Sequence, residues 1–191
     1  MIEDDDPGWP INLDILWVLV PRYGIQRMAR DRPPLIRLRL TWVATVCFLL
    51  LFGVVIAFLS MRPPPNARGI PPLSLVLLGA TIVGCYGLEP RLERPLDASS
   101  PERLIGTYTT RYFLRVAFAQ SIALVGFLAV FMAGRQWVYW AALLISAPGM
   151  WRAAPTRSAL RRDQRRLSEQ ATRLSLARTL AAPSAASPTD T

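Results

Sequence analysis

Four long apolar stretches, each flanked by charged or proline-rich residues, dominate the chain. They cover residues 41–60, 72–88, 113–133 and 136–151. An α-helix rises about 1.5 Å per residue, so about 20 apolar residues cross the hydrocarbon core of a bilayer, which is about 30 Å thick. The first and third stretches reach this length, and the other two are shorter. The pattern predicts an all-α integral membrane protein, a four-helix bundle with four spans.

The flanking segments carry helical signals of their own. In the N-terminal segment of residues 1–40, apolar residues recur at helical spacing between residues 11 and 28, which predicts an interfacial helix on the cytoplasmic membrane surface. A helix packed on the protein's own loops is the alternative. Residues 152–180 predict one cytoplasmic arginine-rich helix that lies on the membrane or on a partner, and residues 181–191 predict a disordered tail.

The connections between the stretches contain a helix start and a turn. Ser100, Pro101 and Glu102 suit the N-cap, the first helical position and the positive end of the helix dipole, so the third helix is expected to begin near Pro101. Gly134 and Arg135 are typical of a tight turn. The third and fourth spans are therefore expected to form an antiparallel hairpin.

The positive charge is distributed unevenly between the two sides of the predicted membrane. All 22 basic residues are arginines, and the net charge is +9. Only Arg62, Arg68 and Arg135 fall in the connections on one side. By the positive-inside rule the other side is cytoplasmic, so both termini are expected in the cytoplasm. The exclusive use of arginine is typical of GC-rich bacterial genomes, and the predicted location is the bacterial inner membrane.

The same charge bears on the expected partners. Cations near a membrane surface attract anionic lipid headgroups. Arg115, at the edge of the third stretch, and four arginines of the predicted cytoplasmic helix are the candidate contacts for headgroups or a partner; these four are Arg161, Arg162, Arg165 and Arg166. No recognition-helix pattern or aromatic-interleaved basic strand supports nucleic-acid binding.

The composition excludes most catalytic chemistry. The chain has no histidine and no lysine, and none of its 13 acidic residues falls inside an apolar stretch. Metal clusters, Schiff-base chemistry and a Ser-His-Asp triad are thereby excluded, and a proton relay would lack ionisable groups at depth. We expect no enzyme, no cofactor and no metal site. The acidic residues of the 89–112 loop are interpreted as solvated partners of nearby arginines, and Cys47 and Cys85 as reduced thiols.

One polar stripe interrupts the third stretch. Gln120, followed by Ser121, lies some way into the predicted span, where lipid cannot satisfy an amide. Ala119, Ala123 and Gly126 share one helix face, and their small size would let another helix approach closely. These five residues predict a helix-packing or polar contact within the membrane. A ligand or ion contact is the alternative.

Gln120, Ala123 and Gly126 also carry a resemblance. Their spacing resembles the second helix of the proteolipid c subunit of rotary ATP synthases, in which an acidic residue precedes an alanine at +3 and a glycine at +6. The resemblance implies helix-dense packing, and because Gln120 replaces the acidic residue it does not imply proton translocation. The whole chain resembles the small four-span membrane proteins of actinobacteria.

These observations lead to two functional hypotheses. The first is a non-enzymatic accessory or scaffold subunit of a membrane complex, which binds partner helices or a second copy through the stripe around Gln120. The second is a homo-oligomeric transport or channel component with a pathway near Gln120. The two differ in whether the polar position faces a partner helix or a conducting path.

Overall fold

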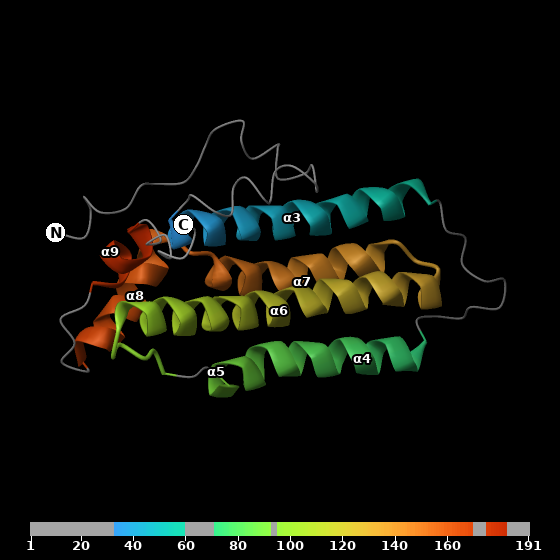
Figure 1. The fold of residues 1–191 in the computed structure, drawn as a ribbon. Coiled ribbons are helices and arrows are strands. Elements are labelled where there is room, and N and C mark those ends of the chain that lie inside the picture. Colours follow the sequence, from blue (N-terminus) through green and yellow to red (C-terminus); the bar gives the residue numbers. More distant parts are fainter. Residues whose placement is uncertain (1–32, 60–70, 93–94, 170–174, 183–191) are drawn as a thin grey trace, which may run out of the picture. The chain divides into compact units, whose positions relative to one another are not determined.

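The computed structural model describes residues 33–59, 71–92, 95–169 and 175–182. Every regular element in this part of the chain is a helix (Figure 1). The elements are α3 (Pro34–Phe58), α4 (Pro72–Val83), the π-helix η1 (Gly84–Leu88), α5 (Glu89–Leu92), α6 (Pro101–Ala133), α7 (Trp137–Ala153), α8 (Arg157–Glu169) and α9 (Leu176–Ala181). The predicted all-α class is confirmed for these residues. The predicted interfacial helix at residues 11–28 and residues 183–191 of the predicted tail lie outside them.

Two of the described helices are long and apolar enough to cross a membrane. They are α3, with 25 residues, and α6, with 33 residues. The helical segment Pro72–Leu88 is apolar but shorter. Two of the four predicted spans therefore correspond to helices that could span a bilayer by length and composition.

Proline, serine and glycine define several helix ends. α3 begins at Pro34 and α6 at Pro101, where a missing backbone N–H costs nothing because the first turn of a helix has no acceptor for it. Ser100 caps α6 as expected, since its Oγ accepts a hydrogen bond from the Arg103 N–H at 3.2 Å. Gly134, with a φ of 61°, follows α6 and allows the turn into α7.

The C-terminal segment differs from the single helix expected over residues 152–180. α7 continues through Pro148 to Ala153, and α8 and α9 are separate helices. The N–H of Leu176 donates to Oε1 of Gln164 at 2.6 Å, so a side chain of α8 caps the start of α9. The break lets α9 pack against α8, which a straight helix over residues 152–180, about 43 Å long, could not do.

The described chain divides into two compact units. Among the described residues, unit 1 comprises 33–44, 95–109, 154–169 and 175–182, and unit 2 comprises 45–59, 71–92 and 110–153. α3 and α6 contribute residues to both units, whereas α4 and α7 belong to unit 2 and α8 and α9 to unit 1.

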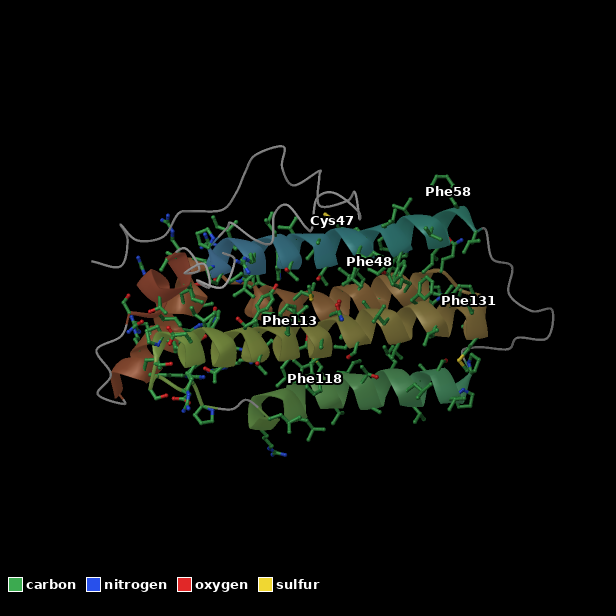
Figure 2. The ribbon with its side chains drawn as sticks, in the orientation of Figure 1. Cys47, Phe48, Phe58, Phe113, Phe118 and Phe131 are labelled. Carbon is green, nitrogen blue, oxygen red and sulfur yellow. The ribbon has the colours of Figure 1, made fainter. Side chains whose placement is uncertain are left out.

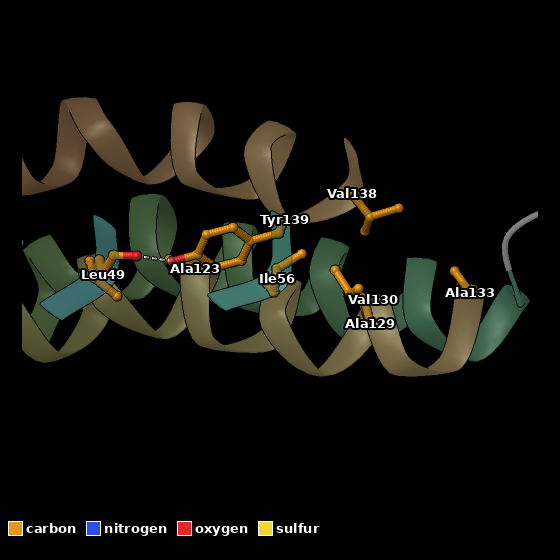
Figure 3. Close-up of a cluster of buried hydrophobic side chains, with 8 residues drawn as sticks. All are labelled: Leu49, Ile56, Ala123, Ala129, Val130, Ala133, Val138 and Tyr139. Carbon is orange, nitrogen blue, oxygen red and sulfur yellow. Dashed lines mark hydrogen bonds between the residues drawn. The ribbon is translucent and has the colours of Figure 1, made fainter. Parts of the chain in front are cut away.

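The larger core of unit 2 joins α3, α6 and α7 (Figure 3). Its buried residues are Leu49, Ile56, Ala123, Ala129, Val130, Ala133, Val138 and Tyr139. Two side chains of the α7 end of this core bond to α3 backbone: the Tyr139 hydroxyl donates to the Leu49 carbonyl, and Gln136 Nε2 donates to the Ile56 carbonyl at 3.1 Å. Because Ile56 lies in the last turn of α3, Gln136 satisfies a carbonyl that the helix itself leaves without a partner.

A second core of unit 2 joins η1, α6 and α7. Cys85, Ile122 and Ala142 are its buried members, and Phe118 and Tyr86 pack against them. The Tyr86 hydroxyl donates to the Ile145 carbonyl at 2.6 Å. Pro148 has no N–H to donate to the Leu144 carbonyl four residues earlier in α7, and the Tyr86 hydroxyl bonds to the adjacent carbonyl, that of Ile145.

Unit 1 has a leucine core with one arginine inside it. Its fully or nearly fully buried leucines are Leu35, Leu38, Leu40, Leu96, Leu104, Leu160, Leu167, Leu176 and Leu180. Arg39 is 0% exposed, and its Nε donates to the Pro155 carbonyl at 3.3 Å. The buried guanidinium therefore links the start of α3 to the segment that precedes α8.

The exposed apolar side chains have a clear location. Every large apolar side chain that is exposed among the described residues belongs to unit 2. Phe58, at 82% exposure, and Phe48, Phe113 and Phe131 are examples (Figure 2). Unit 2 therefore combines two apolar cores with an apolar surface.

Candidate functional site: the α6 stripe and the α8 arginine face

The small residues of the predicted stripe lie at the contact between α6 and α7. Ala119 is 1% exposed and Ala123 is 0% exposed. A Cβ built on Gly126 would lie 2.2 Å from the Cβ of Ala142, which is far inside van der Waals contact. Only a glycine fits α6 at this point, so the stripe is occupied by a helix of the same chain.

The stripe has a second close approach nearer the other end of α7. A Cβ built on Gly149 would lie 3.1 Å from the Cβ of Ala119 and 3.7 Å from Sγ of Cys85. At each approach a glycine faces an alanine: the glycine lies on α6 at Gly126, opposite Ala142, and on α7 at Gly149, opposite Ala119. Cys85 is buried at the same place, with an exposed fraction of 2%.

Gln120 lies beside this contact rather than in it. Successive residues of an α-helix are about 100° apart, so Gln120 is about 100° around α6 from Ala119. Phe113, Leu124 and Phe131 lie at −7, +4 and +11 residues from Gln120, on its side of the helix, and all three are exposed. Gln120 is therefore a half-buried amide at the border of the exposed apolar side of α6, since Val116 and Phe127, at −4 and +7, are buried and half-buried.

The two polar side chains of the stripe differ in their bonding. Ser121 Oγ donates to the Phe118 carbonyl at 2.7 Å, so its own helix satisfies the hydroxyl. The amide of Gln120 forms no hydrogen bond with any residue that the structure describes. Of the pair, Gln120 is the residue that retains hydrogen-bonding capacity for another molecule.

The predicted cationic contacts fall into two environments. Arg115 is half-buried on α6. On α8, the four predicted arginines Arg161, Arg162, Arg165 and Arg166 are exposed, as is Arg157. The opposite side of α8 is buried through Ala159, Leu160, Asp163 and Leu167. We call the five exposed arginines of α8 the arginine face. The apolar side of α8 is thus buried by the chain's own unit 1, which differs from the expectation that it lies on a membrane.

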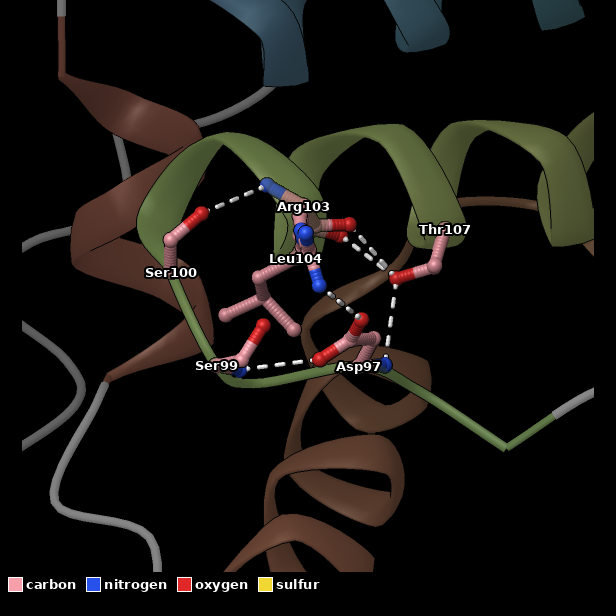
Figure 4. Close-up of polar contacts among 6 residues, drawn as sticks. All are labelled: Asp97, Ser99, Ser100, Arg103, Leu104 and Thr107. Carbon is pink, nitrogen blue, oxygen red and sulfur yellow. Dashed lines mark hydrogen bonds and ion pairs between the residues drawn. The ribbon is translucent and has the colours of Figure 1, made fainter.

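The acidic loop before α6 forms a local turn (Figure 4). The Ser99 N–H donates to Oδ1 of Asp97 at 3.0 Å, and Oδ2 of Asp97 lies 3.7 Å from the Arg103 guanidinium. The Ser99 hydrogen bonds, with the Arg103 charge, hold the pKa of Asp97 below its ordinary value of 3.8. Asp97 is therefore an ionised, solvent-exposed partner of an arginine, as the sequence indicated, while Glu93 lies outside the described residues.

Sequence reasoning missed three polar contacts that organise the helices. The hydroxyls of Tyr86 and Tyr139 bond to carbonyls of neighbouring helices, and Arg39 is buried although it was counted only as a topological charge. A tyrosine inside an apolar stretch is a usable signal, because its hydroxyl needs a partner once buried. For Arg39 the sequence offers no signal that separates it from the neighbouring Arg37.

Comparison with protein-family models, curated proteins and solved structures found no match to this chain. The resemblance of the Gln120 region to the c subunit of rotary ATP synthases, and that of the whole chain to small actinobacterial membrane proteins, stay predictions.

Proposed function

We propose that this protein is a multi-pass protein of the bacterial inner membrane, with both termini in the cytoplasm and spans near residues 41–60, 72–88, 113–133 and 136–151. In this proposal it is a non-enzymatic accessory or scaffold subunit. It holds a partner helix against the exposed side of α6, with Gln120 as the polar contact.

The observation that carries the proposal is the apolar surface of unit 2. A water-soluble domain rarely exposes contiguous apolar patches beyond a few hundred Å². Unit 2 exposes large apolar side chains on α3, α4, α6 and α7, whereas the described part of unit 1 exposes none. Lipid or partner helices are the environment in which such a surface is stable.

The ends and hydroxyls of the shorter helices support the same placement. Trp137 and Trp151, near the two ends of α7, are 54% and 72% exposed, and exposed tryptophans are typical of the membrane–water interface. Thr81 Oγ1 donates to the Leu77 carbonyl and Ser146 Oγ donates to the Leu143 carbonyl, at 2.7 and 2.8 Å. Hydroxyls bonded to their own helix suit an environment without water.

The role of Gln120 follows from its surroundings on α6. An amide among exposed apolar side chains is costly in lipid unless another polar group meets it. The small-residue face of α6 is already occupied by α7, so a partner would approach from the side of Gln120 and Leu124. Interhelical hydrogen bonds of this kind contribute about 0.6–2 kcal/mol, enough to favour one pairing of helices over another.

The test is the Gln120→Leu variant, purified in native nanodiscs from the source membrane. We expect the variant to fold as the wild type does and to lose a stoichiometric membrane partner, or a second copy, that the wild type retains. Mass spectrometry identifies the co-purifying chains, and mass photometry gives the oligomeric state.

Leu124→Ala is the matched control, because it changes the same side of α6 without removing a polar group. It should leave the partner in place. If Gln120→Leu changes neither partner nor oligomeric state, the assigned role of Gln120 is wrong. A Gln120-dependent homo-oligomer that conducts ions or solutes after reconstitution would favour the transport hypothesis instead.

A further inference from the structure

The arginine face of α8 is the most concentrated charge in the described part of the chain. Arg157, Arg161 and Arg165 are four residues apart, and Arg162 and Arg166 form the adjacent row, so all five lie along one side of a 13-residue helix. The one aspartate of α8, Asp163, is 3% exposed and belongs to the buried side. The solvent side of α8 therefore presents cations along its length.

A short linker joins the helix that carries this face to the proposed membrane span of α7. Residues 154–156 alone separate Ala153, the last residue of α7, from Arg157, the first residue of α8. Four residue steps span at most about 14 Å between the two Cα atoms, even when fully extended. If α7 ends at the membrane surface, the Cα atom of Arg157 lies within about 14 Å of it, less than twice the Debye length of about 8 Å at physiological ionic strength.

The burial pattern determines how α8 can engage a membrane. An interfacial amphipathic helix normally inserts its apolar side among the acyl chains. In this protein Leu160 and Leu167 are 3% and 1% exposed, so the chain itself already covers that side. Contact with a membrane is then left to the guanidinium groups, which form bidentate hydrogen bonds with phosphate.

We propose that the arginine face of α8 binds the phosphate groups of anionic phospholipids at the cytoplasmic membrane surface, without insertion of α8. The inference rests on the proposed function, since it requires that α7 ends at that surface. Anionic lipid is the ligand that charge complementarity favours, because a cationic face held near a bilayer meets the anionic headgroups at high local concentration.

The test measures phosphatidylglycerol binding by the full chain in mixed micelles with phosphatidylcholine, by native mass spectrometry. We compare wild type with the variant Arg161→Gln/Arg162→Gln/Arg165→Gln/Arg166→Gln. The phosphatidylglycerol concentration at which half of the protein retains the lipid (the midpoint) should rise at least about tenfold in the variant, since each cation near an anionic surface strengthens binding several-fold. Wild-type retention should also fall steeply between low and high salt, because no apolar insertion supports it.

The matched control removes exposed arginines elsewhere. Arg91→Gln/Arg103→Gln changes two exposed arginines outside α8 and should raise the midpoint less than the double variant Arg161→Gln/Arg165→Gln does, because Arg103 lies 3.7 Å from the Asp97 carboxylate. Glutamine keeps a high helix propensity, so α8 is expected to fold in the quadruple variant. If that variant unfolds, the double variants Arg161→Gln/Arg165→Gln and Arg162→Gln/Arg166→Gln, with the salt dependence of the wild type, give the same discrimination.

Two failures are distinguishable. A chain that inserts into nanodiscs but binds phosphatidylglycerol equally well with and without the arginine face overturns this inference alone. A chain that stays soluble and monomeric without detergent overturns the proposed membrane placement, and this inference falls with it. If wild-type protein retains phosphatidylglycerol equally at low and high salt, the inference that α8 binds without insertion is also overturned, because such retention would indicate apolar insertion.

Discussion

Unit 1 and unit 2 are both helical, yet they sort their side chains in opposite ways. Unit 1 buries its leucines and exposes the arginines of α8, which is the arrangement of a domain in water. Unit 2 buries alanine, glycine and a few larger residues at helix contacts and exposes phenylalanine, leucine, valine and tryptophan. Under the proposed function this difference corresponds to two solvents, water around unit 1 and lipid around unit 2. In water, helices associate by burying large apolar groups; in lipid, small residues and polar contacts decide which helices pair.

The comparison is tested most severely by placing a charge on the apolar surface of unit 2. Leu128 on α6 is 61% exposed. In water, Leu128→Arg would be nearly neutral or would improve solubility. In a membrane it should disfavour the inserted state by about 3 kcal/mol, since arginine at the centre of a span costs about 2.5–3.5 kcal/mol. Carbonate extraction of membranes measures the inserted fraction, which should fall relative to wild type.

Leu128→Ala serves as the control for this substitution, because it keeps the position apolar and should leave the inserted fraction nearly unchanged. A Leu128→Arg protein that remains as firmly inserted as wild type would show that this side of α6 does not face lipid. The two-solvent interpretation of unit 2 would then fail at α6.

The next effect concerns close packing in unit 2. Gly126→Ala should destabilise the folded protein by about 1–3 kcal/mol, the usual range for overpacking, because the new Cβ would meet the Cβ of Ala142 at 2.2 Å. Gly79→Ala, on α4, is the matched control, since a Cβ built there meets nothing within 4 Å. It should be neutral or stabilise α4 by about 0.5–1 kcal/mol through helix propensity.

Thermal unfolding in detergent, followed by size-exclusion chromatography, compares the two glycine variants. Equal melting temperatures for Gly126→Ala and Gly79→Ala would contradict the close approach of α6 and α7. A lowered melting temperature for Gly126→Ala alone would support glycine as the residue that sets this helix contact.

The smallest expected effect is a pH dependence of stability that arises from Asp97 in unit 1. The pKa of Asp97 is lowered in the folded protein, so ionised Asp97 favours the folded state above its ordinary pKa of 3.8. This contribution is lost as pH falls below 3.8 towards the folded pKa, and it is constant between pH 5 and pH 8. Asp97→Asn should therefore lower stability slightly at neutral pH and remove the small loss of stability that wild type shows below pH 3.8.

Unfolding curves between pH 2.5 and pH 7 measure this difference. Wild type and Asp97→Asn should converge at the acidic end, because protonated Asp97 is neutral like asparagine. A difference that grows towards acid would contradict the lowered pKa. Screening by solvent keeps the effect small, since the carboxylate is exposed.

The sequence by itself determined much of the fold for physical reasons that act locally. Apolar runs and their lengths predicted the helices, proline and serine predicted the start of α6, and Gly134 predicted the turn before α7. Such signals depend on neighbours within a few residues, where propensity, capping and backbone sterics are decided. The same local pattern identified Ala119, Ala123 and Gly126 as one face of α6.

The tertiary structure decided what each face meets. Gly126 contacts Ala142, Tyr86 bonds to the Ile145 carbonyl, and Leu176 bonds to Gln164. The sequence around each of these residues does not predict which residue it contacts. It also distinguished Arg39, buried on the Pro155 carbonyl, from the exposed arginines of α8, which local sequence treats alike. The reason is that burial and pairing between distant segments depend on the packing of the whole chain, whereas helix formation depends on the segment alone.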